Sequence, residues 1–285
     1  MRTWREAVDG ATRLLADAGV PSPRVDALAL AAHVLGVDHL VLVMAPAPTP
    51  EALARFAELV DRRRSREPLQ HITGRMPFRH LVLAAAPGAF IARPETEVVA
   101  EEAIAAARAV GGRPVVVDLC TGSGAIALAV ATEVPHAQVW AVELSEAALA
   151  VARRNVAAHA PAVRLVAGDA ADALPELDGA VDVVVANPPY IPPDAVPQEA
   201  EVREHDPDLA LYGGGPDGLA VPRAVVRTAA RLLRGGGVLV MEHAEVQAAA
   251  VRELVASTGA FAAVRTAPDL TGRDRMVLAR RATGS

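Results

Sequence analysis

The sequence has 285 residues, 52% of them hydrophobic, and its net charge is −6. An acidic chain that contains no lysine is a poor candidate for avid, non-specific binding to nucleic acids. A single cysteine, Cys120, excludes an intrachain disulfide framework, and no apolar run reaches the roughly 18 residues that a membrane span needs. The N-terminus also lacks the apolar region of a signal peptide, so we expect a soluble, cytoplasmic protein.

Residues 1–75 are expected to form a small domain of short helices. Ser22 and Thr49 each precede a proline, a pattern typical of a helix N-cap followed by the first helical position. The arginine-rich run 61–66 is interpreted as a solvated helix end, because cations suit the C-terminal end of the helix dipole. An acidic or RNA-bearing partner is the alternative. Residues 76–92 are turn-rich and then alternate, which predicts a β-hairpin linker.

From residue 93 onward, apolar strands alternate with helices. The pattern predicts helices at 94–110, 125–132, 146–158, 221–233 and 246–255, and strands at 115–118, 139–143, 163–166, 181–186, 238–241, 261–266 and 275–280. Continuous apolar strands between helices indicate an α/β fold with a mostly parallel, doubly wound sheet. Ligands of such sheets bind beyond the carboxyl ends of the strands.

Two motifs follow the first two of these strands. The loop from Asp118 to Gly124 reads DLCTGSG; its glycines allow a tight turn and a close approach by a ligand. It leads into a helix N-terminus, which favours an anionic group such as a carboxylate. Glu143 ends the next strand, about 20 residues on, where a carboxylate can bind ribose hydroxyls. As alternatives, the glycine loop could be a mere turn and Glu143 a solvated strand end.

Two more motifs follow the next two strands. Gly168-Asp169 ends one of them, and Asp169 can accept a hydrogen bond from an exocyclic amine such as that of adenine; an Asx turn is the alternative. Asn187-Pro188-Pro189-Tyr190 follows the strand 181–186, and its prolines stiffen the chain. The Asn187 side-chain oxygen and the Pro188 carbonyl can accept both hydrogens of an –NH2 group, while the Tyr190 ring covers its flat face.

These four motifs, at successive strand ends, resemble those of class I S-adenosylmethionine-dependent methyltransferases. Asn-Pro-Pro-Tyr resembles the motif of enzymes that methylate planar amino nitrogens: adenine N6, guanine N2 and the glutamine amide. Four further segments, 70–74, 92–97, 210–219 and 269–275, are similar to the PrmC (HemK) family. That family methylates the glutamine of the Gly-Gly-Gln motif in peptide chain release factors.

The resemblance implies a seven-stranded, mostly parallel, Rossmann-like methyltransferase domain at 93–285 and a release-factor-binding domain at 1–75. It implies S-adenosylmethionine as cofactor, S-adenosylhomocysteine as product and class I release factors as partners. The scattered histidines predict no metal site, the charge and hydropathy predict no DNA or membrane contact, and we expect a monomer. The expected catalytic residues are Asn187, Pro188 and Tyr190, and Pro189 joins them in substrate binding. The expected cofactor-binding residues are Cys120, Thr121, Gly122, Ser123, Gly124, Glu143, Asp169, Ala170 and Asn187.

Three residues depart from the family pattern. Cys120 stands where glycine is usual, and it is tolerable if its φ is negative; a positive φ would cost roughly 1 kcal/mol or more. Glu143 replaces the common aspartate, and Ala170 replaces an aromatic residue, which thins one adenine contact.

Three other functions stay open. The protein could methylate a glutamine of a ribosomal protein, or an amino group of a flipped nucleic-acid base, or it could bind cofactor or release factor without catalysis. The acidic charge disfavours the nucleic-acid alternative. The acidic segment 192–217, after the Asn-Pro-Pro-Tyr motif, is interpreted as a substrate-channel loop, and a solvated loop is the alternative.

Overall fold

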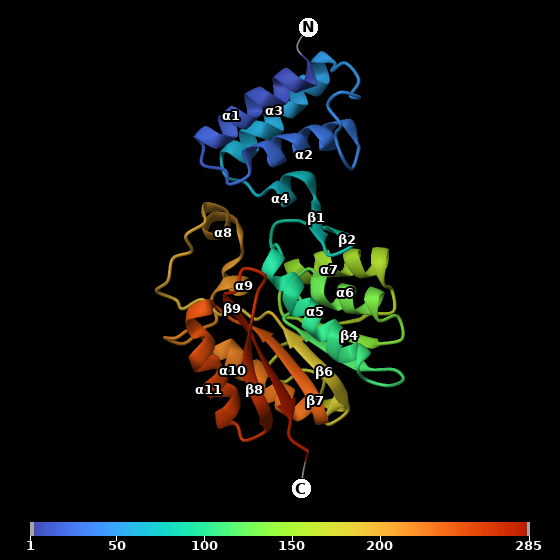
Figure 1. Ribbon diagram of the computed structural model, residues 1–285, viewed down its shortest axis with the longest axis vertical. Coiled ribbons are helices and arrows are strands. Elements are labelled where there is room, and N and C mark those ends of the chain that lie inside the picture. Colours follow the sequence, from blue (N-terminus) through green and yellow to red (C-terminus); the bar gives the residue numbers. More distant parts are fainter. Residues whose placement is uncertain (1–2, 284–285) are drawn as a thin grey trace. The chain divides into compact units, whose positions relative to one another are not determined.

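The computed structural model describes residues 3–283, and the chain forms two compact units (Figure 1). The helical unit comprises residues 1–75 and 197–205, and the sheet unit comprises residues 76–196 and 206–285. The chain therefore leaves the sheet unit after residue 196 and returns to it at residue 206. Segment 192–217, which the sequence predicts to be a loop, contains two short helices, α8 (Ala200–His205) and α9 (Asp208–Leu211).

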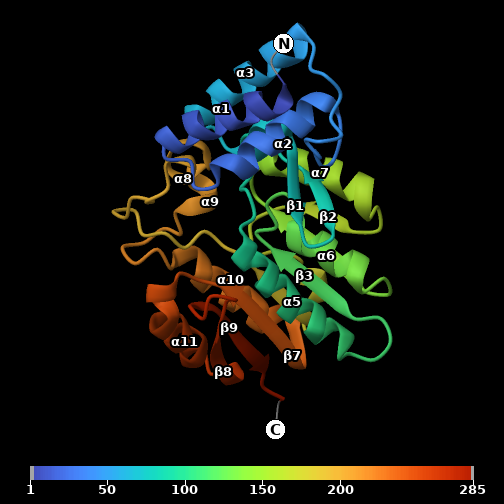
Figure 2. The same ribbon diagram turned by 45° about the horizontal axis from the view of Figure 1, so that its top comes forward.

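The helical unit is built from helices (Figure 2). It buries Trp4 and Phe56, whose rings meet edge to face with their centroids 5.6 Å apart. The Thr49 side chain accepts a hydrogen bond from the Ala52 backbone, as its predicted N-cap position requires. Ser22 occupies the other N-cap position, but its ψ of 61° is not extended and its hydroxyl makes no capping bond. Besides α8, the helices are α1 (Trp4–Asp17), α2 (Pro23–Leu35), α3 (Pro50–Arg64) and α4 (Leu69–Thr73).

The interpretation of residues 61–66 as a solvated helix end is wrong for two of its arginines. Arg63 is only 5% exposed; its Nε donates to Asp26 over 2.7 Å and its Nη2 to Glu201 over 2.8 Å. Arg66 also binds Glu201, with 2.9 Å from its Nε to Oε1. Because a buried guanidinium needs carboxylate partners, Glu201 ties segment 197–205 to the end of α3.

The sheet unit has seven strands in the order β5-β4-β3-β6-β7-β9-β8. The first five pair in parallel, and β9 runs antiparallel to both of its neighbours, β7 and β8. This confirms the predicted seven-stranded, mostly parallel α/β fold. A separate hairpin pairs β1 (Arg75–Phe78) with β2 (Leu81–Ala84). The sheet strands are β3 (Val115–Leu119), β4 (Gln138–Glu143), β5 (Arg164–Ala167), β6 (Val181–Ala186), β7 (Leu233–Glu242), β8 (Phe261–Pro268) and β9 (Asp274–Arg281).

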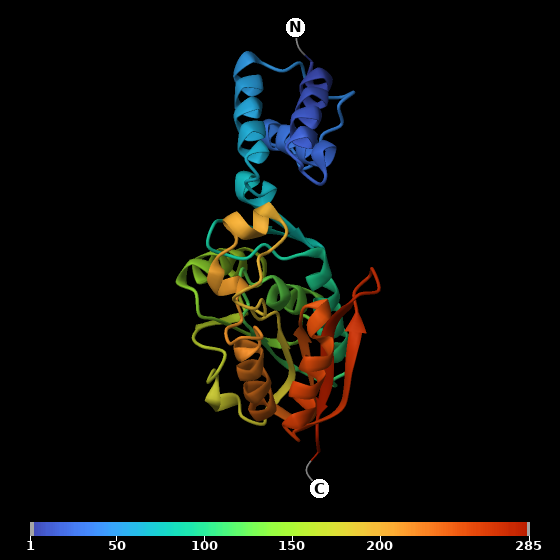
Figure 3. The ribbon, with the colours of Figure 1, turned by 90° about the vertical axis from the view of Figure 1, so that its left-hand side faces the viewer.

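Helices cover both faces of this sheet (Figure 3). On one face, α5 (Pro94–Arg108), α6 (Ala125–Glu133) and α7 (Glu146–His159) pack on one apolar cluster. On the other face, α10 (Ala220–Leu232) and α11 (Ala248–Ser257) pack on a second cluster. Central strand β6 is buried at every position, as expected of a strand covered by helices on both sides.

Two predicted elements differ in extent. Strand β7 begins at Leu233 and includes the glycine run 235–237, which the sequence places before the strand. Its pairing with β6 shifts register between Val181 and Val183, so the glycines fill an irregular start of the strand. The last helix begins only at Ala248, after a 3₁₀ turn over Glu245–Gln247. Within residues 3–283, no helix is long and apolar enough to cross a bilayer.

Candidate functional site

The four predicted motifs meet at one rim of the sheet. They follow β5, β4, β3 and β6, which are consecutive neighbours in the sheet and run in the same direction. Their carboxyl ends therefore place Asp169, Glu143, the glycine loop and Asn187 side by side. Strand β7 is next to β6, and the pairing of Ala186 with Met241 brings Glu242 level with Asn187.

Buried Asp118 shapes the glycine loop from below. Its Oδ2 accepts hydrogen bonds from the Thr121 hydroxyl over 2.5 Å and from the Ala127 backbone over 3.1 Å. Burial raises the pKa of this carboxyl to about 7, although both hydrogen bonds oppose the rise. The loop turns through Gly122 and Gly124, with φ of 60° and 88°.

Cys120 lies in this loop with a φ of 61°. A cysteine fits this position without strain only at a negative φ, and that condition is not met. A side chain in the left-handed region costs roughly 1 kcal/mol or more. Burial, assisted by the charges of Glu143, Asp118 and Asp169, raises the pKa of the Cys120 thiol. The thiol therefore stays protonated and is a poor nucleophile.

Glu143 is fixed by two backbone groups. Its Oε2 accepts from Gly122 N over 2.8 Å, and its Oε1 accepts from Ser145 N over 2.8 Å. A carboxylate has about four acceptor positions, so each oxygen can accept a further bond from a ligand. The space above the loop is open, because a Cβ built on Gly122 would meet no atom within 4 Å.

Asp169 makes the Asx turn that the sequence analysis left as its alternative. Its Oδ1 accepts from Ala171 N over 2.8 Å, and the residue is exposed at the end of β5. Because this bond uses Oδ1, Oδ2 can still accept from a ligand, and the turn and the ligand role are compatible. Ala170 beside it is buried, at 7% exposure.

The Asn-Pro-Pro-Tyr motif is supported at both ends. The Asn187 Nδ2 faces the Thr96 hydroxyl of α5 at 3.4 Å, a long hydrogen bond. The Tyr190 hydroxyl donates to Glu242 Oε1 over 3.2 Å. Burial and the nearby charge of Glu242 raise the pKa of the Tyr190 hydroxyl, which therefore stays neutral. Pro188 between them is buried, and Pro189 is half-buried.

The glycine-rich segment 210–219 packs directly against this motif. Gly213 N donates to the Ile191 carbonyl over 3.1 Å. A Cβ at Gly213 would lie 2.6 Å from the Pro189 carbonyl oxygen, and one at Gly218 would lie 2.4 Å from that of Tyr190. Two backbone segments meet here without room for any side chain, which is the physical reason for glycine at both positions.

Three residues that support the Asn-Pro-Pro-Tyr motif lie outside every predicted site set: Thr96, Glu242 and Gln247. Gln247 donates from Nε2 to the carbonyls of Tyr190 and Asp217, over 2.8 and 3.1 Å. Thr96 belongs to the segment 92–97, but no sequence signal tied it to Asn187. Glu242 had a usable signal, since it is an acid at the end of an apolar strand, like Glu143.

Two ion pairs involve segments that the family resemblance singled out. Arg275 binds Asp269 with two nitrogens, at 3.1 and 3.0 Å, and hydrogen bonds within this turn lower the pKa of Asp269 to about 2. Arg93 donates to Asp206 over 2.6 Å, at the residue where the chain re-enters the sheet unit. Both pairs fix loops next to the rim.

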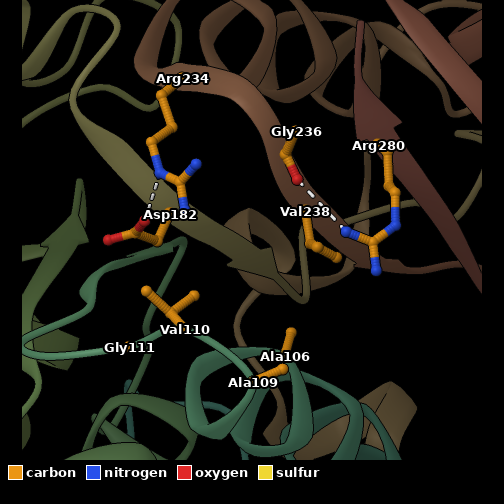
Figure 4. A pocket seen from close by; sticks show the side chains of 9 residues that line it. All are labelled: Ala106, Ala109, Val110, Gly111, Asp182, Arg234, Gly236, Val238 and Arg280. Atoms are coloured by element: carbon orange, nitrogen blue, oxygen red, sulfur yellow. Dashed lines mark hydrogen bonds and ion pairs between the residues drawn. The ribbon is translucent and has the colours of Figure 1, made fainter. Parts of the chain in front are cut away.

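A cavity of about 320 Å³ opens far from the rim, at the amino end of β6 (Figure 4). Asp182 and Arg234 line it as an ion pair, and Arg280 donates to the Gly236 carbonyl over 3.3 Å. None of the predicted site residues lines this cavity. Among residues 3–283, no group of three or more His, Cys, Asp or Glu side chains is arranged to hold a metal ion.

Comparison with known proteins agrees with this architecture. Residues 6–74 match the model of the PrmC N-terminal domain, and residues 102–202 match the methyltransferase small domain. A methyltransferase structure from Pyrococcus furiosus superposes with a TM-score of 0.54 at 19% identity, covering 72% of this chain and 91% of that one. The fold and its strand-end motifs thus define a class I S-adenosylmethionine-dependent methyltransferase.

The family follows from closer relatives. A release factor glutamine methyltransferase of Streptomyces coelicolor is 53% identical over 95% of this chain and 96% of its own. One from Mycolicibacterium smegmatis is 50% identical over 99% of each chain. The chain belongs to the release factor glutamine methyltransferase (PrmC/HemK) family.

A further relative bears on substrate choice. A 4-amino-L-phenylalanine/4-methylamino-L-phenylalanine methyltransferase of Streptomyces pristinaespiralis is 44% identical over 93% of this chain and 91% of its own. Relatives at similar identity to this chain are therefore named for different substrates, a release factor glutamine in one case and an amino-substituted phenylalanine in the other.

Proposed function

We propose that the protein transfers a methyl group from S-adenosylmethionine to a glutamine side-chain nitrogen in class I peptide chain release factors. The glutamine is that of the Gly-Gly-Gln motif. The observation that carries the proposal is the orientation of Asn187, whose nitrogen faces Thr96 and whose oxygen is thereby turned away from it.

The rim has the donors and acceptors that S-adenosylmethionine requires. When bound, this cofactor supplies a methyl group on a positively charged sulfur. Glu143 has free acceptor positions for the ribose hydroxyls, and Asp169 Oδ2 has one for the adenine amine. The loop from Cys120 to Gly124, which is open above Gly122 and leads into α6, suits the methionine carboxylate. Ala170 would adjoin the adenine.

The Asn-Pro-Pro-Tyr motif would hold the substrate. An amide nitrogen is a weak nucleophile because its lone pair is delocalised into the carbonyl, so alignment has to do most of the work. The Asn187 oxygen and the Pro188 carbonyl would accept its two N–H bonds and stabilise the positive charge that develops on it. The Tyr190 ring would cover the amide plane, with Pro189 stiffening the turn between them. The nitrogen would then release one proton to water or to a backbone acceptor.

The helical unit would bind the release factor. We assign this role to residues 1–75, the linker role to 76–92 and catalysis to 93–285. The enzyme would act as a cytoplasmic monomer, without DNA or membrane contact, and S-adenosylhomocysteine would be its second product.

One parallel assay tests this function. Purified protein and methyl-labelled S-adenosylmethionine are incubated separately with a class I release factor, ribosomal proteins, DNA and 4-amino-L-phenylalanine. We expect label on the release factor alone, and none after its Gly-Gly-Gln glutamine is changed to alanine. Label on one of the other substrates, with none on the release factor, would refute the assignment and name the alternative.

A further inference from the structure

Glu242 lies beside both ends of the Asn-Pro-Pro-Tyr motif, Asn187 and Tyr190. It ends β7, level with Asn187 across the parallel pairing of β6 and β7, and it is 3% exposed. Its Oε1 accepts the hydroxyl proton of Tyr190. Burying a carboxyl group this deeply costs free energy unless hydrogen bonds or opposite charges compensate it. The methyl transfer proposed above does not involve this group.

Thr96 connects the same carboxylate to the other end of the motif. It is 2% exposed, and its hydroxyl lies 3.4 Å from Asn187 Nδ2. Burial raises the pKa of the Glu242 carboxyl to about 7, and the Thr96 hydroxyl, which favours the charged form, opposes this rise. Among the described residues Oε2 of Glu242 has no hydrogen-bond partner, so this oxygen can still accept a hydrogen bond from the Thr96 hydroxyl.

The direction of these hydrogen bonds determines which Asn187 atom faces the substrate. A threonine hydroxyl has one proton and two lone pairs. When Glu242 is ionised, the Thr96 proton can turn to its carboxylate; only lone pairs then remain for Asn187, and these can receive Nδ2 but repel Oδ1. The Asn187 oxygen is thereby directed away from Thr96. A flipped amide would present hydrogens where the substrate nitrogen needs an acceptor.

We propose that Glu242 and Thr96 are positioning residues that fix the orientation of the Asn187 amide, while Glu242 also holds the Tyr190 ring. The proposal deepens the function above and rests on it for the identity of the substrate. It concerns neither cofactor contacts nor bond making.

The first test needs no substrate. The chain has only two asparagines, Asn155 and Asn187, so protein labelled with ¹⁵N-asparagine gives two side-chain NH2 pairs in an NMR spectrum. Asn155 is an internal reference, since its Nδ2 is bound by the carbonyls of Ala84 and Ser123 at 3.1 and 3.0 Å. We expect Thr96→Val to shift or broaden the Asn187 pair alone. Thr96→Ser, which keeps the hydroxyl, should leave both pairs near their original positions.

The second test separates positioning from binding. With release factor as substrate, Thr96→Val should lower kcat by about 10- to 100-fold, the scale expected for a misoriented catalytic group. The KM for S-adenosylmethionine should not change, and Thr96→Ser should recover most of the turnover. Thr132→Val is the matched control: that hydroxyl bonds only carbonyls of its own helix, at 2.7 and 3.2 Å. It should retain full activity.

Glu242→Gln provides an independent variant, because its NH2 group introduces a donor facing two hydroxyls. It should disturb the Asn187 NMR pair and lower kcat more than Tyr190→Phe, which removes only one of its two links. Equal kcat and equal Asn187 signals in Thr96→Val and Thr96→Ser would overturn the proposal. If the unmodified protein labels no release factor, the proposed function fails, while the NMR comparison still decides the positioning role.

Discussion

Gln247 donates a hydrogen bond of 2.8 Å to the backbone carbonyl of Tyr190. Its second donor proton reaches Asp217, so one side chain joins the catalytic edge to the glycine-rich segment behind it. Gln247→Ala should lower the free energy of unfolding by about 1–3 kcal/mol, because two part-buried carbonyls lose their partner. Urea denaturation measures this. Gln198→Ala, at an exposed glutamine, should stay within about 0.5 kcal/mol; equal effects of the two changes would contradict the role of Gln247.

Asn187→Ala tests the substrate grip directly. Removing one hydrogen-bond acceptor should cost about 3 kcal/mol of transition-state stabilisation and so reduce turnover about 100-fold or more. Affinity for S-adenosylmethionine, measured by calorimetry, should be largely retained because Glu143 and the glycine loop are untouched. Turnover at the level of the unmodified protein would eliminate Asn187 as the acceptor.

Glu143→Ala should weaken cofactor binding. Hydrogen bonds to a charged group contribute about 1.5–3 kcal/mol each, so the loss of one or more ribose contacts should raise the dissociation constant at least about 10-fold. The same calorimetric titration on Glu146→Ala is the control, since Glu146 is exposed in the first turn of α7. An unaltered dissociation constant in Glu143→Ala would remove it from the ribose site.

Cys120→Gly should be more stable than Cys120→Ala. Both changes delete the thiol, but only glycine relieves the left-handed strain at φ 61°. That strain amounts to roughly 1–2 kcal/mol, and the greater freedom of glycine in the unfolded chain offsets about 0.4–1 kcal/mol of it. Thermal and urea unfolding of the two variants should therefore rank glycine higher. The reverse ranking would mean that the loop carries no strain.

Asp118 should make stability depend on pH in a defined window. Its pKa in the folded protein is about 7, above its ordinary 3.8. Between these values the folded protein holds a proton that the unfolded chain has released, so stability falls as pH rises. Relative to Asp118→Asn, the unfolding free energy should drop by at most about 1.4 kcal/mol per pH unit from pH 4 to 7 and then level off. A difference curve that is flat across this window would show that the carboxyl is not perturbed.

The sequence predicted the strand ends well and the supporting contacts poorly. Apolar strands such as 181–186 are recognisable from their composition. The alternation of strands and helices then brings Asp169, Glu143 and Asn187 to one rim. Thr96 and Gln247 lie 91 and 57 residues from the side chain or carbonyl that they bind, and no local pattern encodes such a pairing. The sign of φ at Cys120 could not be predicted either, because the loop sequence is compatible with both signs and only the folded loop over Asp118 fixes one of them.

The strict need for glycine at 213 and 218 shows the same limit. The motif was visible in the sequence, but its cause, the close approach of two backbones, is a property of the folded chain. Sequence reasoning therefore located the candidate site and left the reasons for its rigidity to the structure.

The placement of Glu201 bears on how this protein can be divided. Cutting the chain after residue 75 would yield all three long helices of the helical unit yet discard the carboxylate that binds Arg63 and Arg66. In such a fragment the guanidinium of Arg63, which is buried in the whole protein, would lose the carboxylate of Glu201. For anyone dissecting the protein, its natural boundary is discontinuous, and a short peptide spanning 197–205 belongs with the N-terminal piece.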